Sequence, residues 1–130
     1  MGVKYLWDTN IAIYYLQQQF PLSSEEFIDL IISEESPVIS VISEIELLCW
    51  KTASEKDNEV LREFINDSIV IELETAIKLK TAELRKLYRI KLPDAIIAAT
   101  ALVYELTLVT RNIEDFKNIA NLNLIDPWNL

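Results

Sequence analysis

The chain has 130 residues, 51% of them hydrophobic, and its 12 basic and 21 acidic side chains give a net charge of −9. This length and composition indicate one folded domain and argue against disorder. The chain has no histidine and one cysteine. These counts exclude histidine-based catalysis within the chain, a zinc site built from histidine and cysteine, and an intrachain disulfide.

The longest apolar stretch, residues 95–109, is shorter than a membrane span and contains Glu105. The sequence does not open with a basic segment followed by an apolar core, so we expect neither a signal peptide nor a membrane partner. The single cysteine agrees with a reducing compartment, and a cytoplasmic location is expected.

The hydrophobic pattern of the first half predicts alternating strands and helices. Residues 3–7 have the length of a buried strand, and residues 9–18 have helical spacing up to the break at Pro21. Ser23 or Ser24 is expected to cap a second helix, which has an apolar stripe over residues 27–32. A strand at residues 37–40 should precede helices at residues 43–50 and 55–66.

The second half continues the alternation. Strands are predicted at residues 68–71, 106–110 and 122–125. An amphipathic helix is predicted at residues 75–88, and a helix at residues 94–104 is apolar nearly all round and therefore buried. The predicted fold class is α/β: one domain over residues 1–130, with a central parallel sheet of four to five strands and helices on both faces.

Acidic side chains follow the predicted strands. Asp8 comes after the first strand, Glu46 after the second and Asp115 after the fourth, while Asp94 begins the buried helix. The carboxyl ends of parallel strands meet at one edge of the sheet, so these acids should converge. Convergent carboxylates suit Mg²⁺ or Mn²⁺. Such ions activate a water and stabilise the phosphorus centre, so phosphodiester cleavage needs no side-chain base.

Each of these acids also has a structural explanation. Asp8 could simply cap the next helix, and Asp94 after Pro93 is a normal helix opening. Asp115 could be a surface turn residue, and Glu46 the polar side of a helix. A metal site is favoured because all four acids fall at the same predicted edge.

Two glutamates follow the second strand, and they should point to different faces of their helix. Glu46 precedes two leucines and is expected to face the site, whereas Glu44 is expected to be exposed. Ser40 and Ser43 lie near the start of this helix. Their hydroxyls can cap the helix or hold a carboxylate.

Half of all basic residues lie between residues 78 and 91, directly before Asp94. They could form a solvated helix face or guide a phosphate backbone. The candidates for contacts with nucleic-acid phosphates are Arg85, Lys86, Arg89, Lys91 and Arg111.

Four blocks of sequence stand out together: LWDTN (6–10), SVISEIELL (40–48), LPDAIIAATA (92–101) and LVTRNIEDF (108–116). In order and spacing they resemble the PIN-domain nucleases, and within them the VapC-type toxins of toxin–antitoxin pairs, over essentially the whole chain. The resemblance implies an acidic quartet with three supporting polar residues. These are Asp8, Glu46, Asp94 and Asp115, supported by Thr9, Thr110 and Asn112.

The resemblance further implies an endoribonuclease that depends on Mg²⁺ or Mn²⁺ and cleaves RNA with an activated water. It also implies a homodimer and an antitoxin that blocks the site. Two positions depart from the family pattern. Cys49 or Trp50 stands where a small residue is common, and Glu105 stands where glycine is common before the fourth strand.

Other classes fit the residues less well. A receiver-type signalling domain needs adjacent acids after its first strand, and Asp8 has no acidic neighbour. A haloacid-type phosphatase needs a second aspartate where Asn10 stands. The stronger rival is a PIN-like domain that serves as a protein-binding module with little nuclease activity.

Overall fold

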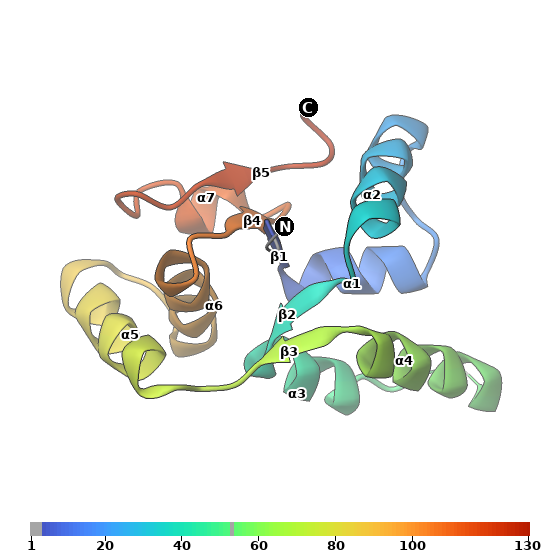
Figure 1. The fold of residues 1–130 in the computed structure, drawn as a ribbon, viewed down its shortest axis with the longest axis horizontal. Helices are drawn as coiled ribbons and strands as arrows, with labels where there is room; N and C mark the ends of the chain where they lie inside the picture. Colours follow the sequence, from blue (N-terminus) through green and yellow to red (C-terminus); the bar gives the residue numbers. More distant parts are fainter. Residues whose placement is uncertain (1–3, 53) are drawn as a thin grey trace.

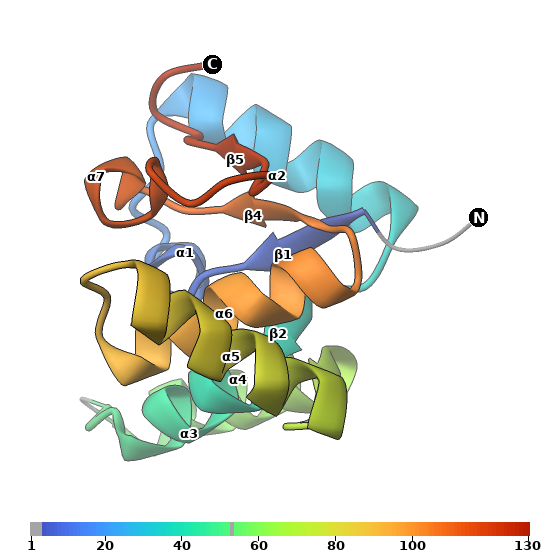
Figure 2. The ribbon, with the colours of Figure 1, turned by 90° about the vertical axis from the view of Figure 1, so that its left-hand side faces the viewer.

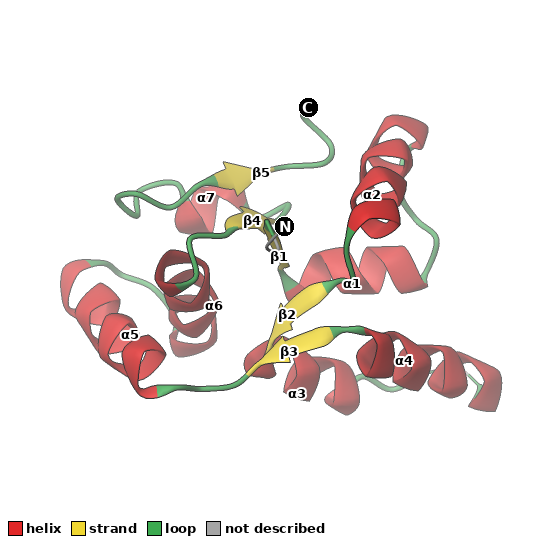
Figure 3. Ribbon diagram, in the orientation of Figure 1, coloured by secondary structure: helices red, strands yellow, loops and turns green. Residues whose placement is uncertain are grey.

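A computed structural model describes residues 4–52 and 54–130. Strands and helices alternate along most of the chain (Figures 1 and 3). In chain order the elements are β1 (Tyr5–Trp7), α1 (Thr9–Leu16), α2 (Leu22–Glu34), β2 (Val38–Ser40), α3 (Val41–Cys49), α4 (Glu55–Asp67), β3 (Ile69–Ile71), α5 (Thr75–Leu87), α6 (Leu92–Val103), β4 (Thr107–Val109), α7 (Ile113–Phe116) and β5 (Leu124–Ile125).

Helices cover both faces of the strands because successive strand residues point to opposite sides. In β1, Leu6 packs with the core under α5, α6 and α7, whereas Trp7 packs with the core under α1, α2, α3 and α4. Val38 and Ile39 divide between the same two cores. Figure 2 shows α5 and α6 on the side that faces the viewer. The predicted α/β fold is confirmed.

In the described residues the strands form two parallel sheets rather than one continuous sheet. β1 pairs with β4 and β4 with β5, while β2 pairs only with β3. β1 and β2 lie side by side (Figure 1). At the start of β1, however, the backbone N–H groups of Lys4 and Tyr5 donate to the carboxylate of Glu35 at 3.2–3.3 Å. A side chain thus occupies donors that a continuous sheet would give to a neighbouring strand.

Several predicted boundaries are shifted. Ser40 caps α3, which therefore begins two residues earlier than expected. Neither Ser23 nor Ser24 caps α2, because Pro21 is its N-cap residue and the Ser24 hydroxyl donates to the carbonyl of Pro127 at 2.6 Å. The helix α7 was not predicted. Val3, expected to begin the first strand, lies outside the described residues.

The helix α6 confirms the predicted burial. Its residues from Ala95 to Ala101 are all buried, and they pack between α5 and the strands β2 and β4. Asp94 stands in the first turn of this rigid helix, where the positive end of the helix dipole favours a negative charge. No helix in residues 4–52 and 54–130 is long and apolar enough to cross a membrane.

Candidate functional site

Asp8 lies at the carboxyl end of β1 and is also the N-cap residue of α1. Its backbone N–H donates to the carbonyl of Val109 in β4, which anchors it to the sheet. One carboxylate oxygen accepts from the backbone N–H of Thr9 at 2.8 Å, and the other accepts from the Thr110 hydroxyl at 2.7 Å. The helix-capping explanation and the site explanation are therefore compatible, because one carboxylate serves both.

Burial raises the pKa of Asp8 from 3.8 to about 6. The hydrogen bonds from Thr110 and Thr9 oppose this rise, while the negative charges of Asp94 and Glu46 add to it. Asp8 is only 5% exposed, so water does little to stabilise its negative charge. The ionised form of Asp8 is held in an environment that lacks positive charge.

Glu46 is hydrogen-bonded to Thr9, the residue that follows Asp8. The Thr9 hydroxyl donates to a carboxylate oxygen of Glu46 at 2.6 Å and also lies 2.8 Å from the hydroxyl of Ser43. Since Thr9 has one hydroxyl proton, which goes to the carboxylate, Ser43 must donate to Thr9. A chain of hydrogen bonds from buried Ser43 through Thr9 thus orients Glu46.

Asp94 and Asp115 line one cleft of about 330 Å³. Asp94 is half-buried in the first turn of α6, and Asp115 is exposed on α7. Burial raises the pKa of Asp94, the charges of Asp115 and Glu46 raise it further, and Lys91 lowers it. The remaining walls come from the α5–α6 connection, from α7 and from the residues after it: Tyr88, Arg89, Ile90, Lys91, Glu114, Asn118 and Ile119.

The four predicted acids interact electrostatically as one group. Asp8 interacts with Asp94 and Glu46, and Asp94 interacts with Glu46 and Asp115. In residues 4–52 and 54–130 no three acidic or cysteine side chains are already arranged as metal ligands. The arrangement is therefore more open than a coordination sphere, as mutual repulsion of like charges requires.

The predicted basic residues divide between different places. Arg89 and Lys91 line the cleft with Asp94. Arg85 donates instead to the carbonyl of Ile90 at 3.1 Å and so braces the α5–α6 connection. Lys86 is exposed on α5. The structure therefore brings two of the five, Arg89 and Lys91, into the cleft that holds Asp94.

Arg111 is in a different environment from the other four. Its guanidinium lies 4.4 Å from the ring centroid of Trp128 and 5.5 Å from that of Tyr14, and it donates to the Tyr14 hydroxyl at 3.0 Å. Arg111 directly follows Thr110, the residue that holds Asp8. Arg111 does not line the cleft that contains Arg89 and Lys91.

The supporting polar residues are placed with differing roles. The hydroxyl of Thr110 donates a hydrogen bond to Asp8, and the hydroxyl of Thr9 donates one to Glu46, so both threonines contact the quartet. Asn112 contributes its backbone, whose N–H donates to the Thr110 hydroxyl at 3.0 Å, while its side chain is exposed. Ser43 could have capped the helix or held a carboxylate. Its hydroxyl contacts the hydroxyl of Thr9, which in turn donates to Glu46.

The expected exposure of the two glutamates is wrong. Glu44 is half-buried and Glu46 is exposed, the reverse of the order inferred from Leu47 and Leu48. Leu47 is buried, but Leu48 is exposed and marks no core face. Glu46 nevertheless makes the contact with Thr9 because the start of α3 packs against α1.

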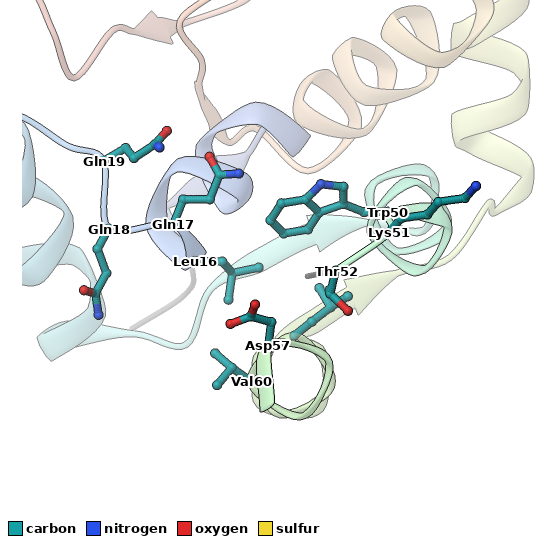
Figure 4. A pocket seen from close by; sticks show the side chains of 10 residues that line it. Leu16, Gln17, Gln18, Gln19, Trp50, Lys51, Thr52, Asp57 and Val60 are labelled. Atoms are coloured by element: carbon teal, nitrogen blue, oxygen red, sulfur yellow. The ribbon is translucent and has the colours of Figure 1, made fainter. Parts of the chain in front are cut away.

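A second hollow, of about 600 Å³, lies away from the quartet between the end of α1 and the α3–α4 connection (Figure 4). None of the four carboxylates lines it. Its walls are formed by Leu16, Gln17, Gln18, Gln19, Trp50, Lys51, Thr52, Asp57, Val60 and Leu61. Two of the four carboxylates, Asp94 and Asp115, line the smaller cleft instead.

Comparison with known proteins agrees with this geometry. The family model "PIN domain" matches residues 5–122. Ribonuclease VapC2 of Rickettsia felis is 30% identical over 95% of this chain and 97% of its own length. Among solved structures, the chain is similar to DNA-bound VapBC from Salmonella typhimurium, with a TM-score of 0.81 and 28% identity over 97% of this chain and 99% of that one. VapBC2 from Rickettsia felis bound to a promoter DNA fragment gives a TM-score of 0.79 and 29% identity over 94% and 97% of the two chains. The chain therefore belongs to the PIN-domain family, and within it to the VapC type.

Proposed function

We propose that the protein is a divalent-metal-dependent endoribonuclease and the toxin of a toxin–antitoxin pair. The observation that carries the proposal is a group of four carboxylates that interact electrostatically, two of which, Asp94 and Asp115, line a cleft together with Arg89 and Lys91. The name of the Rickettsia felis relative, a ribonuclease, agrees with this chemistry.

The donor set fits Mg²⁺ or Mn²⁺. Its groups are carboxylate oxygens, the ligands these hard ions prefer. Asp8 and Asp94 both have a raised pKa, because burial and the neighbouring acids outweigh the groups that favour their negative charges, including Lys91 beside Asp94. When bound, a divalent ion supplies activation of a water and electrostatic stabilisation of the phosphodiester. Asp8, Glu46, Asp94 and Asp115 would hold it.

The chain's own residues prepare the carboxylates for this role. The two hydrogen bonds to Asp8 fix the orientation of both its oxygens, so that remaining lone pairs are available to a ligand. The Thr9 hydroxyl fixes Glu46, and Ser43 fixes Thr9. Such hydrogen bonds from neighbouring side chains commonly tune a metal site.

Basic side chains would receive the substrate. Arg89 and Lys91 are placed to bind RNA phosphates beside Asp94, and Lys91 lowers the pKa of that carboxyl. Lys86 extends the positive surface along α5, and Arg85 contributes its charge although its Nε is bonded to Ile90. These groups offset the net charge of −9, which otherwise repels RNA.

The proposal is tested by incubating a mixed RNA pool with Mg²⁺, with Mn²⁺ and with chelator. The parent protein is expected to cleave only with metal. Asp94→Asn and Asp8→Asn are expected to lower cleavage by at least about a hundredfold, because each removes a ligand charge. Asp29→Asn changes an exposed acid of α2 outside the site and should cleave at the parent rate.

Cleavage by Asp94→Asn at the parent rate would reject the assignment. No cleavage by the parent under any condition, with metal binding retained, would favour a PIN-like domain that serves as a protein-binding module. The antitoxin proposal rests on the similarity to VapBC complexes, and an acidic toxin would attract a basic antitoxin segment.

We also propose a homodimer in the cytoplasm. Leu79 and Leu87 on α5 are 68% and 67% exposed, so α5 presents two large apolar side chains that a second copy of the chain could cover. Exposed Cys49 agrees with a reducing compartment. Light scattering of the parent should give twice the monomer mass, and Leu79→Lys with Leu87→Lys should give the monomer mass.

A further inference from the structure

Arg111 is held by aromatic side chains from two other parts of the chain. Its guanidinium stacks against Trp128 near the carboxyl end of the chain and against Tyr14 of α1, with centroid distances of 4.4 and 5.5 Å. Trp128, Tyr14 and Phe20 contact one another, with ring centroids 4.8–6.3 Å apart. The aromatic group therefore restricts the position of the guanidinium.

Stacking of this kind leaves the edge of Arg111 available. A guanidinium has five N–H donors in its plane, and the one hydrogen bond seen here goes to the Tyr14 hydroxyl. Within residues 4–52 and 54–130, Arg111 forms no ion pair, although the chain carries 21 acidic side chains. A fixed, exposed arginine with free donors suits bidentate binding of a phosphate.

The segment that carries Trp128 is itself anchored. The backbone N–H of Trp128 donates to the carboxylate of Asp126 at 2.9 Å. The buried hydroxyl of Ser24 donates to the carbonyl of Pro127 at 2.6 Å, which ties the segment to α2. Trp128 thus has a defined position against which Arg111 can stack.

Arg111 is also next to the acidic quartet in the chain. The hydroxyl of the preceding residue, Thr110, donates to Asp8 at 2.7 Å and accepts from the backbone of Asn112 at 3.0 Å. Arg111 therefore follows directly the residue that holds a carboxylate of the quartet, and it lies outside the lining of the cleft that contains Arg89 and Lys91.

We propose that Arg111 binds a phosphate of the RNA next to the cleaved bond, and that Trp128 is the positioning residue that orients it. The segment over residues 126–128 is then part of the substrate site. RNA then contacts two separate basic positions, Arg89 with Lys91 in the cleft and Arg111 beside Trp128. This inference rests on the proposed ribonuclease function.

The test measures binding of a fluorescent single-stranded oligouridylate of about twelve nucleotides to the full chain in chelator, at several salt concentrations. Loss of one phosphate contact should reduce the slope of log Kd against log salt by about 0.7. Arg111→Ala and Arg111→Gln are expected to show this change and to raise Kd about tenfold. Arg62→Ala, on an exposed face of α4, is the matched control and should change neither quantity.

Trp128 is tested by the same measurement. Trp128→Ala is expected to raise Kd about threefold with a nearly unchanged salt slope, because the charge of Arg111 remains. Trp128→Phe should restore most of the affinity. In the Arg111→Ala background, Trp128→Ala should have no further effect, since the two residues act together.

Each other result overturns the inference in a distinguishable way. If Arg111→Ala and Arg111→Gln bind with the Kd and salt slope of Arg62→Ala, Arg111 contacts no phosphate, while the ribonuclease proposal stands. If Trp128→Ala weakens binding equally with and without Arg111, Trp128 does not position Arg111. If the parent neither binds the oligouridylate nor cleaves RNA with metal, this inference fails together with the proposed function.

Discussion

Asp8 meets two opposing requirements, because it is buried and yet is proposed to act as an anion. Thr9 and Thr110 donate hydrogen bonds to it and favour its charge, but burial and the neighbouring acids outweigh them and raise its pKa to about 6. A bound cation would remove this conflict. Ionised Asp8 therefore destabilises the fold when no ion is bound, and a bound ion would relieve this destabilisation.

This conflict predicts a particular dependence of stability on pH. Asp8 binds its proton more tightly in the folded state than in the unfolded state, so its stabilising contribution is complete below pH 3.8 and is lost as the pH rises through about 6. Urea unfolding in chelator should show the parent losing on the order of 2–3 kcal/mol relative to Asp8→Asn between pH 4 and pH 7. If the free energy of unfolding changes with pH in the same way for the parent and for Asp8→Asn, this account is contradicted. The control variant Asp29→Asn should show the pH dependence of the parent.

The Ser43–Thr9–Glu46 chain gives a second prediction for single residues. Thr9→Val should lower the free energy of unfolding by about 1–3 kcal/mol, because buried Ser43 loses its hydrogen-bond partner. In the Ser43→Ala background the same substitution should cost less than about 1 kcal/mol, since no buried hydroxyl is then left unpaired. A double-mutant cycle from thermal or urea unfolding measures this coupling. Equal costs in both backgrounds would mean that Ser43 does not depend on Thr9.

At the scale of elements, the turn between α6 and β4 departs from the most favourable backbone. Glu105 has φ of 54°, in the left-handed region, which glycine adopts more readily than other residues. An L-residue with a Cβ pays roughly 1 kcal/mol or more for this conformation, whereas glycine does not. Glu105 therefore introduces local backbone strain in the turn between α6 and β4, and none of the four acids lies in this turn.

Glu105→Gly should therefore raise the free energy of unfolding by up to about 1 kcal/mol and increase the melting temperature. The matched control is Glu59→Gly in the middle of α4, where the backbone is helical and glycine should cost about 1 kcal/mol. Calorimetry of both variants checks the prediction. Destabilisation by both substitutions to the same extent would show that φ at residue 105 is not the limiting factor.

At the scale of the whole molecule, four elements each place an acid at one edge, and no one element could form the site alone. A divalent ion that binds only the folded arrangement should stabilise the entire domain, by about 2.7 kcal/mol at a hundred times its Kd. Thermal unfolding with increasing Mn²⁺ should show this rise for the parent and for Asp29→Asn. Asp94→Asn and Asp8→Asn should show little of it, and a full rise in either would place the ion elsewhere.

Much of the fold could be predicted from the chain because local patterns agree with it. Apolar runs such as residues 5–7 alternate between two cores, and Pro21 and Ser40 mark helix starts close to the expected positions. The described residues form two sheets rather than one, and the backbone at the start of β1 donates to the carboxylate of Glu35, 30 residues away. Hydrophobic pattern carries no information about such a long-range polar contact.

The sequence by itself determined which acids come together, because the carboxyl ends of parallel strands share one edge and the helix α6 begins beside it. Only the tertiary structure decided how each acid is held. The burial of Asp8, the bond from Thr9 to Glu46 and the stacking of Arg111 on Trp128 all join residues distant in the chain. Chain pattern reports local preference, whereas burial, pKa and hydrogen-bond partners depend on which distant elements pack together.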